Sequence, residues 1–123
     1  MLPPQKRLRA WHFAGLLTTY WCNARCRFCY VHGSPDQGGT MDPEEAVTFW
    51  RQLDRVAARE GRRIRIHLTG GEPFGQWENL VAILRAALRA DLPPPQKVET
   101  NAYWALDDEQ TRDRLTVLRD PVS

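Results

Sequence analysis

Three short stretches of the chain have the pattern of an extended strand, and a segment with helical periodicity follows each of them. The first stretch, His12 to Trp21, is mostly apolar and favours an extended conformation. In the second, Ile64, Ile66 and Leu68 alternate with polar residues, as in a strand with one buried face. The third stretch, Lys97 to Trp104, predicts one more short strand.

The first helix is predicted to begin at Asp42. This residue can cap the helix, Pro43 suits the first helical position, and Glu45 stands where a capping box has a carboxylate. Gly61 is a plausible end. A period of 3.6 residues predicts one buried stripe, which consists of Ala46, Phe49, Trp50, Leu53, Val56 and Ala57.

Two more helices are predicted from the same periodicity. The second carries Trp77, Leu80, Val81, Leu84 and Leu88 on one face, and Pro93 to Pro95 are expected to end it. The third follows Asp107, with Leu115 and Leu118 as its apolar anchors. Trp50 and Trp77 lie on helical stripes and are expected in the core.

The order strand, helix, strand, helix, strand, helix predicts an α/β fold with parallel strands. In such folds the chemistry lies at the carboxyl ends of the strands. Three polar or glycine-rich segments stand at those ends: the loop with the cysteines, the turn Gly70 to Pro73, and the pair Thr100 and Asn101. We therefore expect the three segments to converge on one edge of the sheet.

Composition narrows the class of protein. A chain of 123 residues allows one domain or part of a larger one. Its net charge of +2 argues against a nucleic-acid partner or a membrane surface bound through charge. No apolar run approaches the roughly 18 residues of a membrane span, and no signal peptide is recognisable. The expected location is the cytoplasm.

All three cysteines lie within eight positions, as Cys22, Cys26 and Cys29. Thiolates are soft ligands that suit iron–sulfur clusters, zinc and copper(I). Structural zinc sites and all-protein [4Fe–4S] sites normally have four protein ligands, so three thiolates leave one coordination position open. His32 could complete a Cys3His zinc site, and this alternative stays open beside the cluster.

The motifs together resemble those of the radical S-adenosylmethionine (radical SAM) enzymes. "CNARCRFC" is similar to the C-x3-C-x-aromatic-C motif of that family, with Phe28 at the aromatic position. "GGEP" from Gly70 resembles a second family motif, and "VETN" resembles a third, weaker one. The resemblance extends from about His12 to Trp104. It implies a partial (β/α) barrel, and residues 1–123 would form the N-terminal portion of the core domain, with about three strand–helix units.

The resemblance also implies cofactors and roles. Cys22, Cys26 and Cys29 would ligate a [4Fe–4S] cluster whose fourth iron binds S-adenosylmethionine. Reductive cleavage would give a 5′-deoxyadenosyl radical that abstracts hydrogen from an unidentified substrate. An electron donor such as flavodoxin or ferredoxin would supply the electron. The remaining expected cofactor-binding residues are Phe28 near the cluster, Gly70, Gly71 and Glu72 at the methionine ammonium, and Thr100 and Asn101 on the third strand.

The family core has six strand–helix units, and this chain supplies three. Three hypotheses about the chain and its activity therefore stay open at this point. The chain is a fragment of a longer enzyme, half of a split enzyme that a second chain completes, or a non-catalytic iron–sulfur or zinc module that acts with a partner chain. An ion pair between Arg65 and Glu99 inside the barrel is a further hypothesis, with His67 near the pocket and Tyr103 and Trp104 as possible walls.

Overall fold

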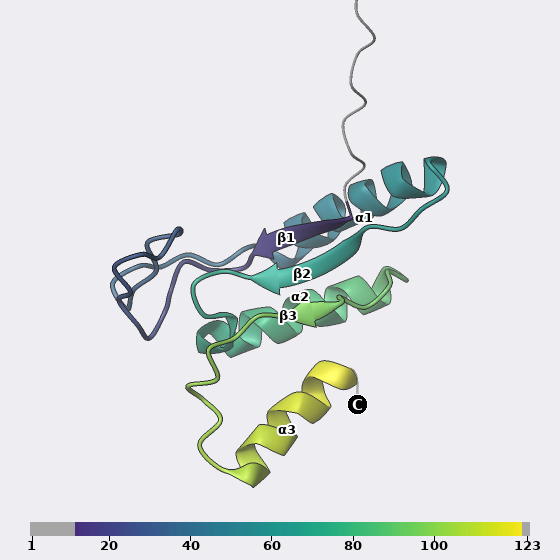
Figure 1. Ribbon diagram of the computed structural model, residues 1–123. Coiled ribbons are helices and arrows are strands. Elements are labelled where there is room, and N and C mark those ends of the chain that lie inside the picture. The colour runs from purple at the N-terminus through teal and green to yellow at the C-terminus, as the bar shows by residue number, and fades with distance from the viewer. Residues whose placement is uncertain (1–11, 122–123) are drawn as a thin grey trace, which may run out of the picture.

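The computed structural model describes residues 12–121 (Figure 1). The chain forms the strands and helices in the predicted alternating order. They are β1 (Phe13–Leu17), α1 (Pro43–Arg59), β2 (Arg65–Thr69), the short 3-10 helix η1 (Pro73–Gln76), α2 (Trp77–Arg89), β3 (Lys97–Val98) and α3 (Asp108–Arg119).

The three strands form one parallel sheet in the order β1-β2-β3, as expected. β1 pairs with β2 over five residues, from Phe13 opposite Arg65 to Leu17 opposite Thr69. Figure 1 shows α1 and α2 on the same side of the sheet. A sheet that adds strands in sequence order and keeps its helices on one side is wound like a barrel, because a doubly wound sheet reverses its strand order and is covered on both sides. This arrangement confirms the expected partial (β/α) barrel.

The core fills the space between this side of the sheet and the helices. Leu16, Ile66 and Leu68 point from the strands toward the helices and are at most 3% exposed, with Leu68 fully buried. Trp50 is 1% exposed, and Trp77 packs against the same cluster, so both expected core tryptophans are confirmed. The cluster also contains Ala46, Val47, Ala57, Leu80, Ile83, Leu84 and Ala87.

The cap at Asp42 and the end at Gly61 are confirmed, and the structure adds a cap at Asp107 that was not predicted. The Asp42 carboxylate accepts hydrogen bonds from the N–H groups of Glu44 and Glu45, and Asp107 caps α3 in the same way through Gln110. Gly61 follows α1 with φ +70°, and the N–H groups of Gly61 and Arg62 close a Schellman motif onto the carbonyls of Ala58 and Ala57.

The end of α2 corrects the prediction that the three prolines would stop it. The helix already ends at Arg89, and the cause is Asp91, which takes the left-handed conformation with φ +57°. The N–H of Leu92 then bonds to the carbonyl of Ala87, and that of Asp91 bonds to the carbonyl of Leu88. A second Schellman motif therefore closes α2 without glycine, before Pro93 is reached.

Several predicted apolar contacts are wrong. Phe49 and Val56 are 49% and 48% exposed, because α1 is rotated so that Val47, on the other flank of the stripe, packs into the core. Leu88 and Leu115 are also about half exposed. Leu118 of α3 does pack against the core, as expected.

Two strands are shorter than predicted. β1 ends at Leu17, because the following backbone bonds to loops: the Thr18 carbonyl accepts from Met41, and the Thr19 carbonyl accepts from Gly71. β3 covers only Lys97 and Val98, with one more bond from the Glu99 N–H to the Leu68 carbonyl. Thr100 to Trp104 form a loop, in which Thr100 and Asn101 bond to Glu72 of the second motif instead.

The other side of the sheet carries Arg65, His67 and Thr69, opposite to the core, as predicted. The proposed ion pair between Arg65 and Glu99 is wrong. Glu99 instead lies 3.3 Å from the Lys97 ammonium and accepts a 3.0 Å hydrogen bond from Thr69. His67 stacks on Phe13, with ring centroids 4.7 Å apart, and bonds to the Gln96 amide. Phe13 remains 59% exposed, so this side is open in the part of the chain that the structure describes.

Candidate metal and cofactor site

The cysteine loop leaves the carboxyl end of β1 and returns to it. Trp21 and Ser34 form an isolated bridge, and the Cys22 N–H bonds to the Ser34 carbonyl at 3.1 Å. Inside the loop, the Cys29 N–H bonds to the Cys26 carbonyl, and the His32 N–H bonds to the Cys29 carbonyl. The backbone thus forms successive tight turns that carry the three thiols.

Two of the thiols accept hydrogen bonds from N–H groups. Cys22 Sγ accepts from the Ala24 backbone at 3.5 Å, and the side-chain amide of Asn101 approaches it at 3.9 Å. Cys29 Sγ accepts from the Gly33 N–H at 3.4 Å. Backbone N–H groups of Gly33, Val31 and His32 lower the pKa of the Cys29 thiol, because they stabilise its thiolate. The thiolate is the form that ligates a metal.

The loop fits a thiolate-ligated group by its donor chemistry. All three cysteines are free, and Cys26 is exposed. Within residues 12–121, no three His, Cys, Asp or Glu side chains stand close enough together to hold a metal ion. His32, the fourth ligand of the zinc alternative, is exposed and has φ +53°. A metal would therefore have to draw the three sulfurs together, as is common where binding and local folding are coupled.

The turn after β2 packs directly on the backbone that leads into the cysteine loop. A Cβ atom at Gly70 would lie 2.4 Å from the Thr19 carbonyl oxygen, and one at Gly71 would lie 2.2 Å from that of Trp21. The N–H groups of Gly71 and Glu72 donate to those same two carbonyls, at 2.8 and 2.7 Å. Only glycine permits this approach, so the two glycines join the first and second motifs.

Glu72 joins the second and third motifs. Its side chain is fully buried. Oε2 accepts from the Phe74 N–H at 2.9 Å, Oε1 accepts from the Asn101 N–H at 2.6 Å, and the Thr100 hydroxyl lies 2.8 and 2.9 Å from the two oxygens. Buried carboxylates need such donors, because an unpaired buried charge is strongly unfavourable.

The third motif continues this network in two directions. Thr100 Oγ1 accepts from the indole N–H of Trp104 at 2.9 Å, and Trp104 stacks on Phe74 with centroids 4.1 Å apart. Asn101 reaches the cysteine loop, since its side-chain nitrogen donates to Asn23 Oδ1 at 2.8 Å as well as facing Cys22. The predicted convergence of three motifs at the carboxyl ends of the strands is confirmed.

The aromatic residues near the site divide into buried and exposed ones. Trp104 is 7% exposed and belongs to the core rather than to a pocket wall. Tyr103 lies beside Trp21, with centroids 6.1 Å apart, and is 39% exposed. Burial raises the pKa of Tyr103, and the negative charge of Glu72 raises it further. The Phe28 side chain is 90% exposed, so the described residues leave it uncovered.

Sequence reasoning missed Thr18, Thr19 and Gly33. Both threonines are 2% exposed, and Thr19 Oγ1 donates to the Gly39 carbonyl at 2.7 Å while it accepts from the Trp21 N–H. A Cβ at Gly33 would lie 3.2 Å from Cys22 Cβ and 3.4 Å from Gly71 Cα. The signal was their position: Thr18 and Thr19 end an apolar strand directly before the cysteines.

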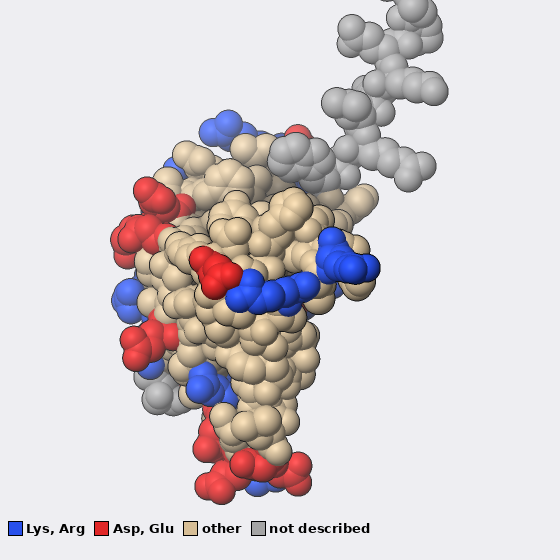
Figure 2. Space-filling model, turned by 90° about the vertical axis from the view of Figure 1, so that its left-hand side faces the viewer, with Lys and Arg blue, Asp and Glu red and all other residues tan. Residues whose placement is uncertain are grey.

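Figure 2 views the molecule from the end that carries the cysteine loop in Figure 1. Acidic side chains gather at the left and lower margins of this surface, and an acidic and a basic side chain stand next to each other near its middle. On the loop itself, Arg25 and Asp36 form an ion pair at 2.6 Å.

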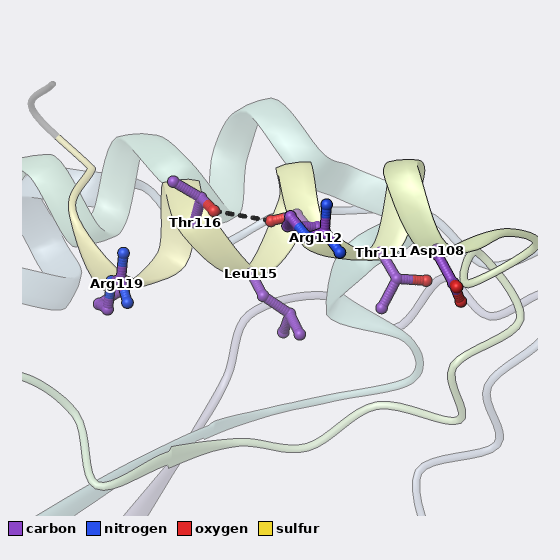
Figure 3. A pocket seen from close by; sticks show the side chains of 6 residues that line it. All are labelled: Asp108, Thr111, Arg112, Leu115, Thr116 and Arg119. Carbon is purple, nitrogen blue, oxygen red and sulfur yellow. Dashed lines mark hydrogen bonds between the residues drawn. The ribbon is translucent and has the colours of Figure 1, made fainter.

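A groove of about 430 Å³ lies elsewhere, along one face of α3 (Figure 3). Its lining comes from one helix: Asp108, Thr111, Arg112, Leu115, Thr116 and Arg119. The bond drawn there, from the Thr116 hydroxyl to the Arg112 carbonyl, is an ordinary contact within a helix. None of the three motifs lines this groove, so it does not belong to the candidate site.

None of the helices in residues 12–121 has the length and apolar character that a membrane crossing requires. A search of curated proteins found no match to the chain. The model of the radical SAM superfamily matches residues 16–118, which include all three motifs. The superfamily generally uses a [4Fe–4S] cluster and S-adenosylmethionine, with a reductant and a substrate. The match covers most of the sequence, and the protein therefore belongs to the radical SAM superfamily.

Proposed function

We propose that Cys22, Cys26 and Cys29 hold a [4Fe–4S] cluster that binds S-adenosylmethionine at its open iron. The observation that carries the proposal is the hydrogen-bonded junction of the three motifs at one edge of the sheet. Gly71 bonds to the entry of the cysteine loop, Glu72 bonds to the third motif, and Asn101 returns to the loop. Three thiolates without a fourth protein ligand suit a cluster that keeps one iron open.

The turn Gly70 to Glu72 would receive the methionine ammonium. Glycine at Gly70 and Gly71 lets other groups approach the backbone closely, and the turn's carbonyl oxygens can accept hydrogen bonds from an ammonium. The Glu72 carboxylate is already bonded to donors of this chain, so it supports the ammonium through its charge and by fixing the turn. Phe28 would lie near the cluster, and Thr100 and Asn101 hold the third motif beside the cofactor.

A cluster held by Cys22, Cys26 and Cys29 would supply the electron for reductive cleavage of S-adenosylmethionine to methionine and a 5′-deoxyadenosyl radical, which would abstract hydrogen from a substrate. The chain's own contribution is to bind, orient and exclude water. The substrate is unidentified. The proposed electron donor is a flavodoxin or ferredoxin, and the proposed location is the cytoplasm.

A second candidate is a cluster-binding half-domain that acts with a partner chain. The open side of the sheet favours it, because Phe13 is 59% exposed and no helix covers that side among residues 12–121. The aromatic side chains of Phe28 and Tyr30 on the cysteine loop are also exposed, and a partner chain would cover them. Here the chain would bind the cofactors, and a second chain would complete the barrel before turnover.

The test is anaerobic reconstitution of the full chain with iron and sulfide, followed by reduction with dithionite. We expect an electron paramagnetic resonance signal of a reduced [4Fe–4S] cluster that changes when S-adenosylmethionine is added. Release of methionine and 5′-deoxyadenosine would then distinguish the enzyme from the cofactor-binding half-domain. Tightly bound zinc without a cluster signal would overturn both candidates in favour of a zinc site.

Two variants sharpen this test. Cys26→Ser removes an expected ligand from the exposed middle of the loop and should abolish the cluster signal. His32→Ala removes the fourth ligand of the zinc alternative and should leave the cluster signal unchanged. If His32→Ala binds zinc more weakly than the wild type, and neither of these two proteins forms a cluster, the site is a Cys3His zinc site.

A further inference from the structure

We propose that Asn101 is a positioning residue whose side-chain amide donates an N–H···S hydrogen bond to Cys22 and thereby raises the reduction potential of the bound cluster. This inference rests on the proposed function. The side-chain nitrogen lies 3.9 Å from Cys22 Sγ, although the two residues are 79 positions apart in the chain.

The amide of Asn101 can face the sulfur in one orientation only. Its oxygen accepts a hydrogen bond from the Tyr103 backbone N–H at 3.1 Å, in a turn closed by the asparagine itself. A backbone N–H is always a donor, so the oxygen must lie on that side and the NH2 group on the other. One of its hydrogens goes to Asn23 Oδ1 at 2.8 Å, and the second is available for Cys22.

The backbone of Asn101 is held equally firmly. Its N–H donates to the buried Glu72 carboxylate at 2.6 Å. Ala102, the next residue, has φ +62°, a left-handed conformation that residues with a Cβ rarely adopt. This conformation turns the chain so that the Ala102 N–H bonds to Thr100 Oγ1 and the Tyr103 N–H bonds back to Asn101. Strain of this kind is typical of functional sites.

A hydrogen bond to a ligating sulfur favours the reduced cluster, because the added electron increases the negative charge on the sulfurs. Cys29 receives its N–H from the backbone of Gly33, and Cys22 receives one from Ala24. These backbone donors are fixed by the fold. Asn101 is the side-chain donor that a substitution can remove, and it connects Glu72 of the second motif to a ligand of the first.

The experiment uses the full chain, reconstituted anaerobically, and measures the midpoint potential by redox titration monitored by electron paramagnetic resonance. Asn101→Asp keeps the acceptor for Tyr103, loses the donor and adds negative charge. Asn101→Leu loses the donor without adding charge. Both potentials should shift to more negative values, with the larger shift for Asn101→Asp. Asn79→Asp makes the same chemical change on α2, at an amide whose nitrogen has no hydrogen-bond partner among the described residues, and should leave the potential unchanged.

A second readout needs no variant. Wild-type protein carrying nitrogen-15 in its asparagine side chains should show a nitrogen-15 coupling to the reduced cluster in pulsed electron paramagnetic resonance. Absence of this coupling, or wild-type potentials in both Asn101 variants, would overturn the role of Asn101 and leave the proposed function standing. If the wild-type chain takes up no cluster at all, the proposed function fails and this inference fails with it.

Discussion

The apolar core behind the sheet and the junction of motifs at the carboxyl ends of the strands are held together by different forces. Behind the sheet, α1 and α2 pack on Leu68 and its apolar neighbours, and the contacts are non-directional. At the carboxyl ends, the motif junction consists of residues 18–34, 70–76 and 100–104. It is held by hydrogen bonds, of which those to Glu72 and Thr19 are buried or half-buried.

This difference teaches which substitutions harm the fold and which harm the site. Apolar burial is shared among many side chains, so each loss is graded by the volume removed. A polar network depends on a few groups, and removing one leaves its partners without a bond. Glu72 belongs to both regions, because it is as buried as the core and its partners lie in two motifs.

Leu68→Ala should produce the largest loss of stability. The side chain is fully buried at the centre of β2, so its loss leaves a cavity and should cost about 3 kcal/mol of the free energy of unfolding. Urea unfolding followed by circular dichroism measures it. Leu115→Ala, at a leucine that is 51% exposed, is the matched control and should shift the midpoint little. Equal effects of the two changes would contradict the core described above.

Glu72→Gln should have the next largest effect, about 2 kcal/mol. Both carboxylate oxygens accept from backbone N–H groups, Oε1 from Asn101 and Oε2 from Phe74. A glutamine has one oxygen, so its NH2 group must face one of these donors in either orientation. Urea unfolding of the metal-free chain measures the loss.

Glu99→Gln is the matched control for this change. Glu99 is exposed, and its partners are the Thr69 hydroxyl and the Lys97 ammonium, both of which can turn to solvent. The same chemical change should therefore have a much smaller effect there. A Glu72→Gln protein as stable as wild type would show that the carboxylate does not join the second and third motifs.

The sequence predicts the fold well where local signals and tertiary contacts agree. The alternation around Ile66 and the cap at Asp42 gave β2 and the start of α1, because strand period and capping are properties of neighbouring residues. The face of α1 was less predictable. Phe49 is apolar and falls on the stripe, but whether it is buried depends on where the sheet lies.

The candidate site shows the same limit. Cys22, Gly70 and Asn101 could be chosen from their motifs and their place after strands. Their connections could not, since the Glu72 carboxylate turns inward to Asn101 and the Lys97–Glu99 pair replaces the expected pair with Arg65. The partner of Glu72 is set by the distance between two segments about 30 residues apart, which the pattern of a single segment does not contain.

Ala102→Gly should stabilise the motif junction slightly, by about 0.5 kcal/mol. Glycine relieves the left-handed strain at φ +62°, and this gain is partly offset by its greater entropy when unfolded. The urea midpoint of the metal-free chain measures it. Ala105→Gly, at a nearby alanine that is partly buried and has no positive φ, should destabilise instead. A loss of stability in both variants would contradict the strain at Ala102.

Replacing all three cysteines by serine should have the smallest effect on the stability of the fold and should abolish the binding of iron. In the metal-free chain the thiols are exposed or half-buried and contribute little apolar packing, so the urea midpoint should stay at the wild-type value under reducing conditions. Iron and sulfide uptake on reconstitution should be lost. Leu68→Ala should show the reverse order, a lowered midpoint with cluster uptake preserved in the fraction that remains folded. If the serine variant unfolds as readily as Leu68→Ala, the thiols are part of the packed structure, and the division between an apolar core and a polar motif junction does not hold.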